Sequence, residues 1–335
     1  MFVRQSIETR EGRTAVSGVD SIDLEAAAHR LRGVAHRTPL LTCAALDEIV
    51  GGHVLIKAEN FQRVGAFKFR GAFNRVSSLT PEQRTRGVVA SSSGNHAQAL
   101  ALAARLCDTT ATILIPDDAP NSKVVATRAY GADVIMFDRY HADRETLTAE
   151  LADRLGATIV HAYDDPFIIA GAGTAGLEIM EDAGWLDVLL VPTGGGGLLA
   201  GSALAARAAQ PSVRIVGVEP EASDDWQRSL AAGERVNVDV GPTIADGQQL
   251  PTPGRLNFEV AAPLLERIVT VSDEDIRVAM RFLFERVKVV AEPSGATAVA
   301  ALLAGKIDAR GQKVGVIISG GNIDVARFTE ILSAS

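Results

Sequence analysis

The sequence predicts an α/β protein with two open, mainly parallel twisted sheets that are flanked by helices. Three observations support this prediction. Short apolar segments alternate with alanine-rich segments of helical length over most of the chain. Nearly half of the residues are hydrophobic (47%) but only 5% are aromatic, a composition typical of globular α/β proteins. A chain of 335 residues can bury a large core, and one or two domains are expected.

The first series of elements precedes the middle of the chain. About the first 18 residues are polar and without periodicity, which indicates a tail. A helix with an acidic start is expected over 23–32. Four strands and three intervening helices then follow, an order that predicts a parallel sheet covered by helices. The strands are expected over 87–90, 111–115, 132–137 and 158–162, and the helices over 95–106, 121–130 and 144–155.

A second series follows Asp164-Asp165-Pro166. It comprises helices over 173–183, 198–209, 273–288 and 294–304 and strands over 188–192, 214–219 and 313–319. We therefore expect two α/β domains: a large one made of 1–86 and 165–335, and a small one, 87–164, inserted into it. Ligands of open parallel sheets bind beyond the carboxyl ends of the strands, so the residues that follow each strand are the candidates for function.

Composition excludes several classes of partner. The net charge of −8 and the lack of a basic cluster argue against nucleic acid. No apolar segment reaches the length that spans a membrane, so no membrane partner is expected. The N-terminus lacks the apolar core of a signal peptide, which favours a cytoplasmic protein. The two cysteines, Cys43 and Cys107, are too few and too far apart for a disulfide framework or a zinc site.

Lys68 is the most informative residue. It follows a Val-Gly-Ala turn and stands between Phe67 and Phe69. Desolvation between two aromatic rings would disfavour the ammonium and leave the amine free to act as a nucleophile, as a Schiff-base lysine requires. On this segment alone the alternative is a surface lysine whose stem covers apolar neighbours.

Two segments are expected to bind anions. Ser91-Ser92-Ser93-Gly94-Asn95-His96 lies between a predicted strand and a predicted helix, where hydroxyls and helix N-terminal amides suit a carboxylate. An ordinary serine N-cap is the alternative. Thr193-Gly194-Gly195-Gly196-Gly197 occupies the same position in the second series, and four glycines allow backbone amides to converge on a phosphate.

A third segment, Ser319-Gly320-Gly321-Asn322, follows the last predicted strand. The Ser319 hydroxyl there could face a heterocyclic nitrogen. A neutral hydroxyl, unlike an aspartate, would not keep that nitrogen protonated as a pyridinium. This limits the electron sink and favours elimination over transamination. A plain turn at the end of a strand is the alternative.

In this order, the four segments resemble the fold-type-II pyridoxal-phosphate enzymes, and within them the branch of serine/threonine dehydratases, serine racemases and 3-hydroxyaspartate dehydratases. The resemblance covers about residues 20–330 and implies a fold like that of the tryptophan synthase β subunit, pyridoxal 5'-phosphate as cofactor and a homodimer. It implies that Lys68 carries the cofactor as a Schiff base and shuttles the α-proton. It further implies cofactor contacts for Phe67 (ring face), Asn95 (ring hydroxyl), Gly194, Gly195, Gly196 and Gly197 (phosphate), Ser319 (pyridine nitrogen), Gly247 and Glu292.

The same resemblance implies a substrate site. Ser92, Ser93, Asn95 and His96 would surround the substrate carboxylate, and Ser93 matches the serine that acts as acid and base on the opposite face in racemases. Arg144 matches an arginine that approaches a second substrate carboxylate, a role that suits a guanidinium. The alternative for Arg144 is a solvated helix start. Tyr163 departs from the asparagine of animal serine racemases, so their pocket details are not carried over.

A metal site is expected after the strand 214–219. Glu219, the Ser223 carbonyl and Asp225 offer oxygen ligands for a hard divalent ion. An acidic surface loop is the alternative from spacing alone. The resemblance to serine racemases favours Mg²⁺ or Ca²⁺, with Mn²⁺ as a further candidate, in a structural or activating role.

Two other classes of protein are weighed against this interpretation. Gly171-Ala-Gly-Thr-Ala-Gly176 fits the dinucleotide pattern of an NAD-dependent oxidoreductase, but no strand precedes it directly and no acidic residue ends the next strand. A helix start packed closely on a neighbour is the preferred interpretation of this segment. A non-enzymatic amino-acid-binding module would not need Lys68 together with the phosphate and ring contacts.

The expected function is that of a pyridoxal-phosphate-dependent ammonia-lyase. It would convert a small-molecule β-hydroxy amino acid (threonine, serine or 3-hydroxyaspartate) to a 2-keto acid and ammonia. Serine racemisation with side dehydratase activity is the alternative, because Ser93 and Lys68 would serve opposite faces of the substrate.

Overall fold

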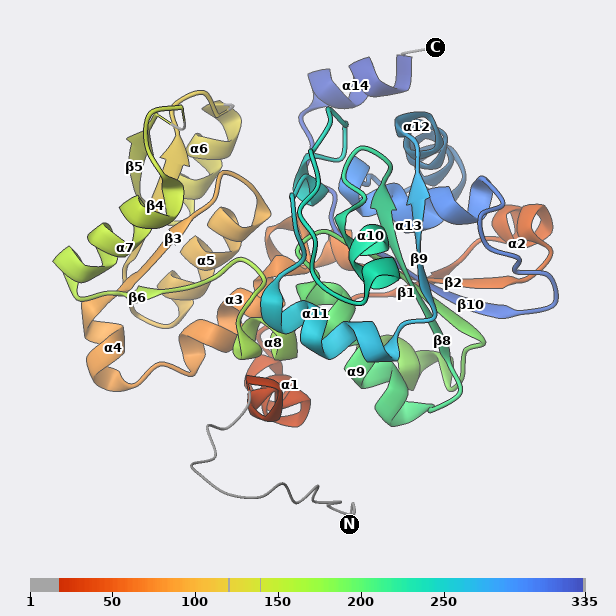
Figure 1. The fold of residues 1–335 in the computed structure, drawn as a ribbon, viewed down its shortest axis with the longest axis horizontal. Helices are drawn as coiled ribbons and strands as arrows, with labels where there is room; N and C mark the ends of the chain where they lie inside the picture. Colours follow the sequence, from red (N-terminus) through yellow and green to blue (C-terminus); the bar gives the residue numbers. More distant parts are fainter. Residues whose placement is uncertain (1–17, 120, 139, 334–335) are drawn as a thin grey trace.

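The computed structural model describes residues 18–119, 121–138 and 140–333, so the expected polar tail lies mainly outside the described residues. The chain forms two sheets that stand side by side and are flanked by helices (Figure 1). The predicted fold class, α/β with two open, mainly parallel sheets, is confirmed. The first predicted helix is α1 (Leu24–Leu31), with Asp23 as its N-cap: the Asp23 side chain accepts a hydrogen bond from the amide of Ala26.

The larger sheet has six strands in the order β1-β2-β10-β7-β8-β9. All pairs are parallel except β1–β2, and the parallel pair β2–β10 joins His53 to Lys313, so distant parts of the chain meet in the centre of this sheet. The strands are β1 (Leu40–Thr42), β2 (His53–Ala58), β7 (Val188–Pro192), β8 (Arg214–Pro220), β9 (Arg267–Val271) and β10 (Lys313–Ile318).

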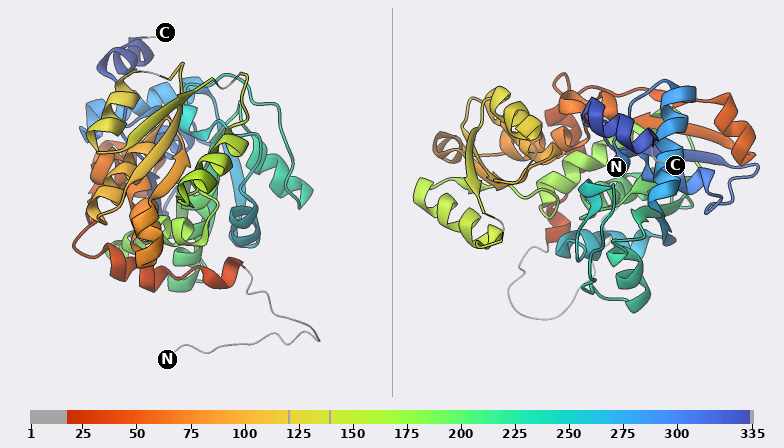
Figure 2. Two further views of the ribbon diagram at one scale, coloured as in Figure 1. Left: turned by 90° about the vertical axis from the view of Figure 1, so that its left-hand side faces the viewer. Right: turned by 90° about the horizontal axis from the view of Figure 1, so that it is seen from above.

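The smaller sheet is parallel throughout and has the order β5-β4-β3-β6. Its last strand is shorter than the predicted 158–162, because pairing with β3 is limited to Thr158 and Ile159. We refer to 87–164 as the small lobe, which is seen face-on in the left view of Figure 2, and to the rest as the large lobe. The small lobe contains β3 (Val88–Ser91), β4 (Ala111–Pro116), β5 (Asp133–Phe137), β6 (Thr158–Ile159), α5 (Asn95–Leu106), α6 (Asn121–Ala129) and α7 (Arg144–Leu155).

Two helices connect the two sheets. Helix α3 (Lys68–Ser77) packs on α5 of the small lobe and on α8 (Pro166–Ala183), and α8 in turn packs on α9 (Gly197–Ala209) of the large lobe. Helix α8 is longer than the predicted 173–183, because Pro166 stands in its first turn and Asp165 caps it. The lysine-bearing helix is therefore held between the two lobes (Figure 1).

The Gly-x-Gly-x-x-Gly segment lies within helix α8 and not at a helix start, so that expectation is wrong. Close packing explains its glycines. A Cβ at Gly173 would lie 2.7 Å from the carbonyl oxygen of Gly201, and one at Gly176 would lie 2.6 Å from the Cα of Ser202. No dinucleotide loop forms here, which removes the observation on which the oxidoreductase alternative depended.

The remaining helices belong mainly to the large lobe. The helix predicted over 273–288 is α12, which continues into a π-helical segment, Leu283–Val287. The other helices are α2 (Ala44–Val50), α4 (Pro81–Arg86), α10 (Asp225–Ala232), α11 (Arg255–Ala261), α12 (Asp273–Phe282), α13 (Pro293–Leu303) and α14 (Val325–Ser333). No helix of the described residues is long and apolar enough to cross a membrane.

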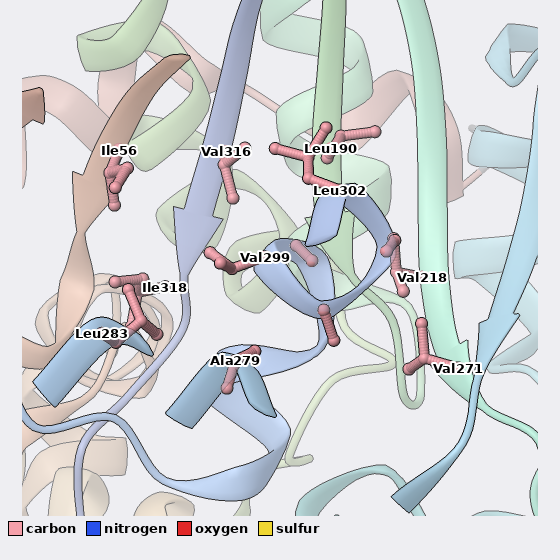
Figure 3. Close-up of a cluster of buried hydrophobic side chains, with 14 of the residues drawn as sticks. Ile56, Leu190, Val218, Val271, Ala279, Leu283, Val299, Leu302, Val316 and Ile318 are labelled. Atoms are coloured by element: carbon pink, nitrogen blue, oxygen red, sulfur yellow. The ribbon is translucent and has the colours of Figure 1, made fainter. Parts of the chain in front are cut away.

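One core of the large lobe lies between its sheet and helices α12 and α13, and a second lies between the sheet and helices α8 and α9. Figure 3 shows Leu190, Val218 and Val316 of three neighbouring strands directed toward Val299 of α13. All four side chains are fully buried. Because helices cover both faces, the central strands β7 and β8 are nearly continuous apolar segments, as expected for a parallel sheet.

Candidate active site

The sequence segments predicted to be functional follow the carboxyl ends of parallel strands in both sheets. The serine segment follows β3, the tetraglycine segment follows β7 and the Ser-Gly-Gly-Asn segment follows β10. Strand ends of parallel sheets are where ligands of α/β proteins bind. Hydrogen bonds and packing contacts bring all three segments and Lys68 into one site between the lobes.

Lys68 begins helix α3 directly after a tight turn. Val64 and Gly65 adopt left-handed backbone conformations there (φ 55° and 71°), which reverse the chain. The Lys68 Nζ donates a hydrogen bond to the carbonyl oxygen of Ala162 at 2.7 Å. It lies 5.1 Å from the ring centre of Phe67 and 5.9 Å from that of Tyr163.

The expectation that Phe67 and Phe69 both desolvate Lys68 is half wrong. Phe69 is fully buried in the core between α3 and α5, beside Phe73. Tyr163 provides the second ring instead. Burial lowers the pKa of Lys68 from 10.5 to about 8, and the nearby Glu292 opposes this shift. About a tenth of the amine is therefore unprotonated at about pH 7, far more than in a solvated lysine, and the unprotonated form is the one that acts as a nucleophile or a base.

The turn before Lys68 is tied to the segment after β10. Ala66 forms an isolated bridge with Gly320, and the amide of Phe67 donates to the Ser319 carbonyl oxygen at 3.0 Å. The Asn322 side chain donates to the Val64 carbonyl oxygen at 2.6 Å. These bonds place Ser319 next to the residues that carry Lys68.

A chain of three polar side chains crosses the site. The Asn95 Nδ2 donates to Glu292 Oε1 at 2.6 Å, and Asn322 Nδ2 donates to Asn95 Oδ1 at 2.8 Å. Burial raises the pKa of Glu292 to about 8, although the Asn95 amide favours its ionised form. The structure thus brings Asn95, Glu292 and Ser319 together around Lys68, and Asn322 is a further member of this group.

Helix α5 begins without a side-chain cap. Its N-cap is Gly94, and no serine hydroxyl caps its amides, so the alternative of an ordinary serine N-cap is wrong. The Ser92 hydroxyl instead accepts a hydrogen bond from the amide of Gly94 at 3.3 Å. Ser92, Ser93 and Asn95 are partly exposed at this helix end, whose first amides have no intrahelical partner. The helix N-terminus is therefore available to an anion.

His96 is buried and neutral. Burial, with Lys68 as a second cause, lowers its pKa to about 3. Its Nε2 lies 3.1 Å from the Val160 carbonyl oxygen, which can only accept, so Nε2 carries the proton. The Nδ1 has no hydrogen-bond partner among the described residues and can only accept. The ring therefore cannot donate to a carboxylate in this tautomer, and the backbone amide of His96 is the group that can.

The tetraglycine segment leads from β7 into α9, whose N-cap is Gly196. Within the described part of the chain, the amides of Gly194, Gly195 and Gly196 donate to no backbone or side-chain acceptor. Gly195 and Gly196 are buried, and unpaired buried amides are costly unless a ligand accepts from them. Three such amides at a helix N-terminus fit a phosphate group.

Large side chains pack directly against this loop. A Cβ at Gly195 would lie 2.4 Å from the Tyr163 ring, and a Cβ at Gly196 would lie 2.1 Å from Trp226. Gly196 also has a left-handed backbone conformation with a φ of 98°. These two glycines are therefore required by space and, at Gly196, by backbone conformation.

Gly247 lies on the other side of the loop. A Cβ at Gly194 would lie 3.1 Å from the Gly247 carbonyl oxygen. The Gly247 amide donates to the Ser294 hydroxyl at 3.0 Å, and the Ser319 hydroxyl lies 3.5 Å from the Ser294 carbonyl oxygen. Ser294 thus connects Gly247, Ser319 and the tetraglycine loop, a link that the sequence did not predict.

Arg144 is the first residue of α7 and is exposed. The pKa of Tyr163 is raised by burial, and the charge of Arg144 lowers it in part. Arg144 therefore lies within electrostatic range of the phenol that covers Gly195. Its guanidinium has no ion pair among the described residues, so it is free to bind an anion.

Glu219 and Asp225 lie outside this group, beyond β8. Burial and the neighbouring Asp225 raise the pKa of Glu219 to about 9, and burial raises that of Asp225 to about 7. Glu219 accepts hydrogen bonds from the amides of Trp226 and Gln227, whereas Asp225 Oδ2 is buried without a partner among the described residues. Two buried carboxylates beside the buried Ser223 are suitable donors for a hard divalent ion, although the described residues hold no cluster of three or more acidic, histidine or cysteine ligands.

The fold and this site define the class of the protein before any comparison. An amine with a lowered pKa, a glycine loop with unpaired buried amides and a serine beside the amine together fit pyridoxal phosphate on a fold-type-II scaffold.

Comparison with known proteins agrees. A sequence profile described as "Pyridoxal-phosphate dependent enzyme" matches residues 31–320, so the chain belongs to this family and is a pyridoxal-phosphate-dependent enzyme. It is 48% identical over 311 residues to an L-threo-3-hydroxyaspartate ammonia-lyase of Saccharomyces cerevisiae, covering 93% of this chain and 95% of that protein. It is 46% identical to a serine racemase of Schizosaccharomyces pombe, covering 93% and 96%. The structure of maize serine racemase matches with a TM-score of 0.89 at 39% identity, covering 93% and 95%.

Proposed function

We propose that this enzyme is an ammonia-lyase for β-hydroxy amino acids and that 3-hydroxyaspartate is its preferred substrate over threonine and serine. The product is the corresponding 2-keto acid together with ammonia. The observation that carries the choice of substrate is the unpaired guanidinium of Arg144 near Tyr163 at the site. It offers a partner for a second carboxylate, which threonine and serine lack.

In this proposal the two helix N-termini of the site bind different groups. The amides of Gly194, Gly195 and Gly196 hold the cofactor phosphate, and Phe67, Asn95, Gly247, Glu292 and Ser319 surround its ring. Bound pyridoxal phosphate supplies a conjugated ring that stabilises negative charge at the substrate α-carbon. The N-terminus of α5, with Ser92, Ser93, Asn95 and the backbone of His96, holds the α-carboxylate.

Lys68 moves the protons at the α-carbon. Burial lowers its pKa to about 8, so more of its amine is unprotonated near neutral pH than in a solvated lysine. Lys68 is placed to take the α-proton of a bound substrate, and the β-hydroxyl group would leave as water after accepting a proton within the site. The site has a second proton donor candidate in Ser93, which supports serine racemisation as the alternative activity.

Four further features belong to the proposal. Glu219, the Ser223 carbonyl and Asp225 bind Mg²⁺ or Ca²⁺, a role for which their buried oxygens are suited. The chain divides into a large domain, 1–86 with 165–335, and a small domain, 87–164, that moves relative to it. The active form is a homodimer, which the exposed neighbours Phe284 and Val290 on one face support. The location is cytoplasmic, with which the free cysteines Cys43 and Cys107 are consistent.

The test is the ratio of kcat/KM for L-threo-3-hydroxyaspartate to that for L-threonine, measured with Mg²⁺ present. We expect a ratio well above one. Arg144→Ala should lower the value for hydroxyaspartate about 10- to 100-fold, as expected for the loss of a charged hydrogen bond, and leave that for threonine unchanged. A ratio below one would contradict the choice of substrate while leaving the ammonia-lyase reaction in place.

Arg154→Ala is the matched control for this test. Arg154 is exposed in the last turn of the same helix, α7, and is far from its N-terminus. Both kcat/KM values should stay at the wild-type level in this variant. An equal loss in both arginine variants would mean that α7 as a whole had been disturbed.

A further inference from the structure

The outward-facing carbonyl groups of the tetraglycine loop have two buried side-chain partners. Trp226 of α10 donates from its indole Nε1 to the Gly194 carbonyl oxygen at 2.6 Å. Asn257 of α11 donates from Nδ2 to the Gly195 carbonyl oxygen at 2.7 Å. Both side chains are fully buried, and both lie outside every role assigned above.

These two bonds also fix where the loop amides point. In a trans peptide the carbonyl and the following N–H project in opposite directions, and the described residues contain no cis peptide bond. Holding the Gly194 carbonyl toward Trp226 therefore directs the Gly195 amide away from it. In the same way, Asn257 holds the Gly195 carbonyl and so directs the Gly196 amide away from Asn257. The Gly195 and Gly196 amides are among those that have no partner in the protein.

Trp226 is itself held in place on two sides. Its ring fills the space over Gly196, where a Cβ would lie 2.1 Å away, and packs beside Phe258 at 5.7 Å between ring centres. Its backbone amide donates to the Glu219 carboxylate at 3.2 Å. The indole therefore has a fixed position from which to orient the loop.

We propose that Trp226, with Asn257 in a secondary role, is a positioning residue that orients the tetraglycine amides toward the cofactor phosphate. This inference rests on the proposed role of the loop in binding that phosphate. Trp226 has the larger effect of the two, because the Gly195 carbonyl oxygen keeps a second donor, the Gly254 amide at 3.1 Å, when the Asn257 side chain is lost.

The test compares two ligands that differ only in the phosphate. The full chain is freed of cofactor, and the dissociation constants of pyridoxal phosphate and of pyridoxal are measured for the wild type and for Trp226→Phe. Phenylalanine keeps a ring over Gly196 but has no N–H donor. We expect the constant for pyridoxal phosphate to rise about three- to tenfold, the range for one lost hydrogen bond, and the constant for pyridoxal to stay unchanged.

Two further variants keep the test decisive. Asn257→Leu should also weaken the binding of pyridoxal phosphate but not of pyridoxal, by a smaller factor. It replaces Trp226→Phe in the test if that variant does not fold. Trp185→Phe changes the other tryptophan of the chain, which is 52% exposed, and should change neither constant. Equal losses for both ligands, or no loss for either in a folded Trp226→Phe protein, would overturn the inference.

A failure of the proposed phosphate site gives a different result. Gly195→Ala alters the loop itself, so it should weaken pyridoxal phosphate binding whether or not Trp226 orients the loop. A loss in Gly195→Ala without one in Trp226→Phe would contradict only the role of Trp226. An unchanged constant in Gly195→Ala would contradict the phosphate site as well.

Discussion

Two helix N-termini, one from each lobe, meet at the site, and they are built differently. Helix α9 begins at a glycine loop whose carbonyls are held by the buried Trp226 and Asn257. Helix α5 has Gly94 as its N-cap and follows serines that are partly exposed and do not cap it. We infer that the helix end proposed to bind the phosphate is rigid before a ligand binds, whereas the helix end proposed to bind the substrate carboxylate can adjust. A site that keeps one cofactor and exchanges many substrates suits such a division.

Lys68 lies between these two helix N-termini, and its replacement should lower the activity more than any other change considered. Lys68→Ala should lower kcat by about 10³-fold or more, because both the covalent attachment of the cofactor and the base are removed. The thermal unfolding midpoint should not fall, since burying this amine is itself unfavourable. The measurements are steady-state kinetics and calorimetry. Activity near the wild-type level would contradict the catalytic assignment.

Gly195→Ala tests the rigidity of the phosphate end. The new Cβ would lie 2.4 Å from the Tyr163 ring. Because the loop is held on its other side, we expect a penalty of about 1–3 kcal/mol in cofactor binding, which is roughly 10- to 100-fold in the dissociation constant. Equilibrium titration with pyridoxal phosphate gives this value. Binding as tight as in the wild type would contradict both the proposed phosphate site and the rigidity of this loop.

Ser93→Ala tests the adjustable end. If Ser93 serves the face opposite to Lys68, its loss should lower serine D/L interconversion about 10²-fold and leave elimination close to the wild-type rate. Chiral chromatography and a coupled 2-keto-acid assay measure the two reactions. Ser92→Ala is the comparison variant: Ser92 is proposed to contact only the α-carboxylate, so its loss should lower both reactions alike. Parallel losses of both reactions in Ser93→Ala would contradict a face-specific role.

The pH dependence of cofactor attachment reports on Lys68 directly. Burial lowers its pKa to about 8, so the unprotonated fraction rises with pH and levels off above that value. The rate of covalent attachment should therefore rise about tenfold from about pH 6 to 7 and be nearly constant above about pH 9. Borohydride trapping followed by mass spectrometry measures this rate. A rise that continues to about pH 10 would indicate a solvated lysine. Glu292→Gln should move the midpoint lower, because Glu292 favours the ammonium.

Gly94→Ala should have the smallest effect and is the counterpart of Gly195→Ala. Its Cβ would meet nothing within 4 Å, and its φ of −117° suits any residue. The free energy of unfolding should change by less than about 0.5 kcal/mol, and cofactor binding should not change. Chemical denaturation and the same titration provide the values. A large loss of cofactor affinity would show that a change at the N-terminus of α5 affects phosphate binding at the N-terminus of α9.

Much of this site could be predicted from the sequence. The serine segment, the tetraglycine and Ser319 were assigned because each follows a predicted strand, whereas Lys68 was assigned because it follows a turn and stands between two phenylalanines. The structure brings all four together. The error at Phe69 has a geometric cause. Lys68 begins a helix, where adjacent side chains point about 100° apart, so Phe67 and Phe69 cannot both cover one amine.

The residues that the sequence did not predict act through backbone atoms. Trp226 and Asn257 contact carbonyl oxygens of glycines that precede them by many residues, and no local pattern signals such a contact. Asn322 was part of a recognised segment, but its bond to Asn95 depends on how the lobes pack. The one signal for this contact in the sequence was the tryptophan that directly follows Asp225.

The pairing of β2 with β10 also governs how this chain can fold while it is being made. All strands of the smaller sheet lie between Val88 and Ile159 and can pair early. The apolar strand β2 must wait for Lys313–Ile318 to emerge, on the order of tens of seconds at about 5–20 residues per second. Until then only β1 covers one of its edges. Slow synthesis or lack of chaperones should therefore expose this strand to aggregation, so the yield of soluble enzyme depends on the residues near both ends of the chain.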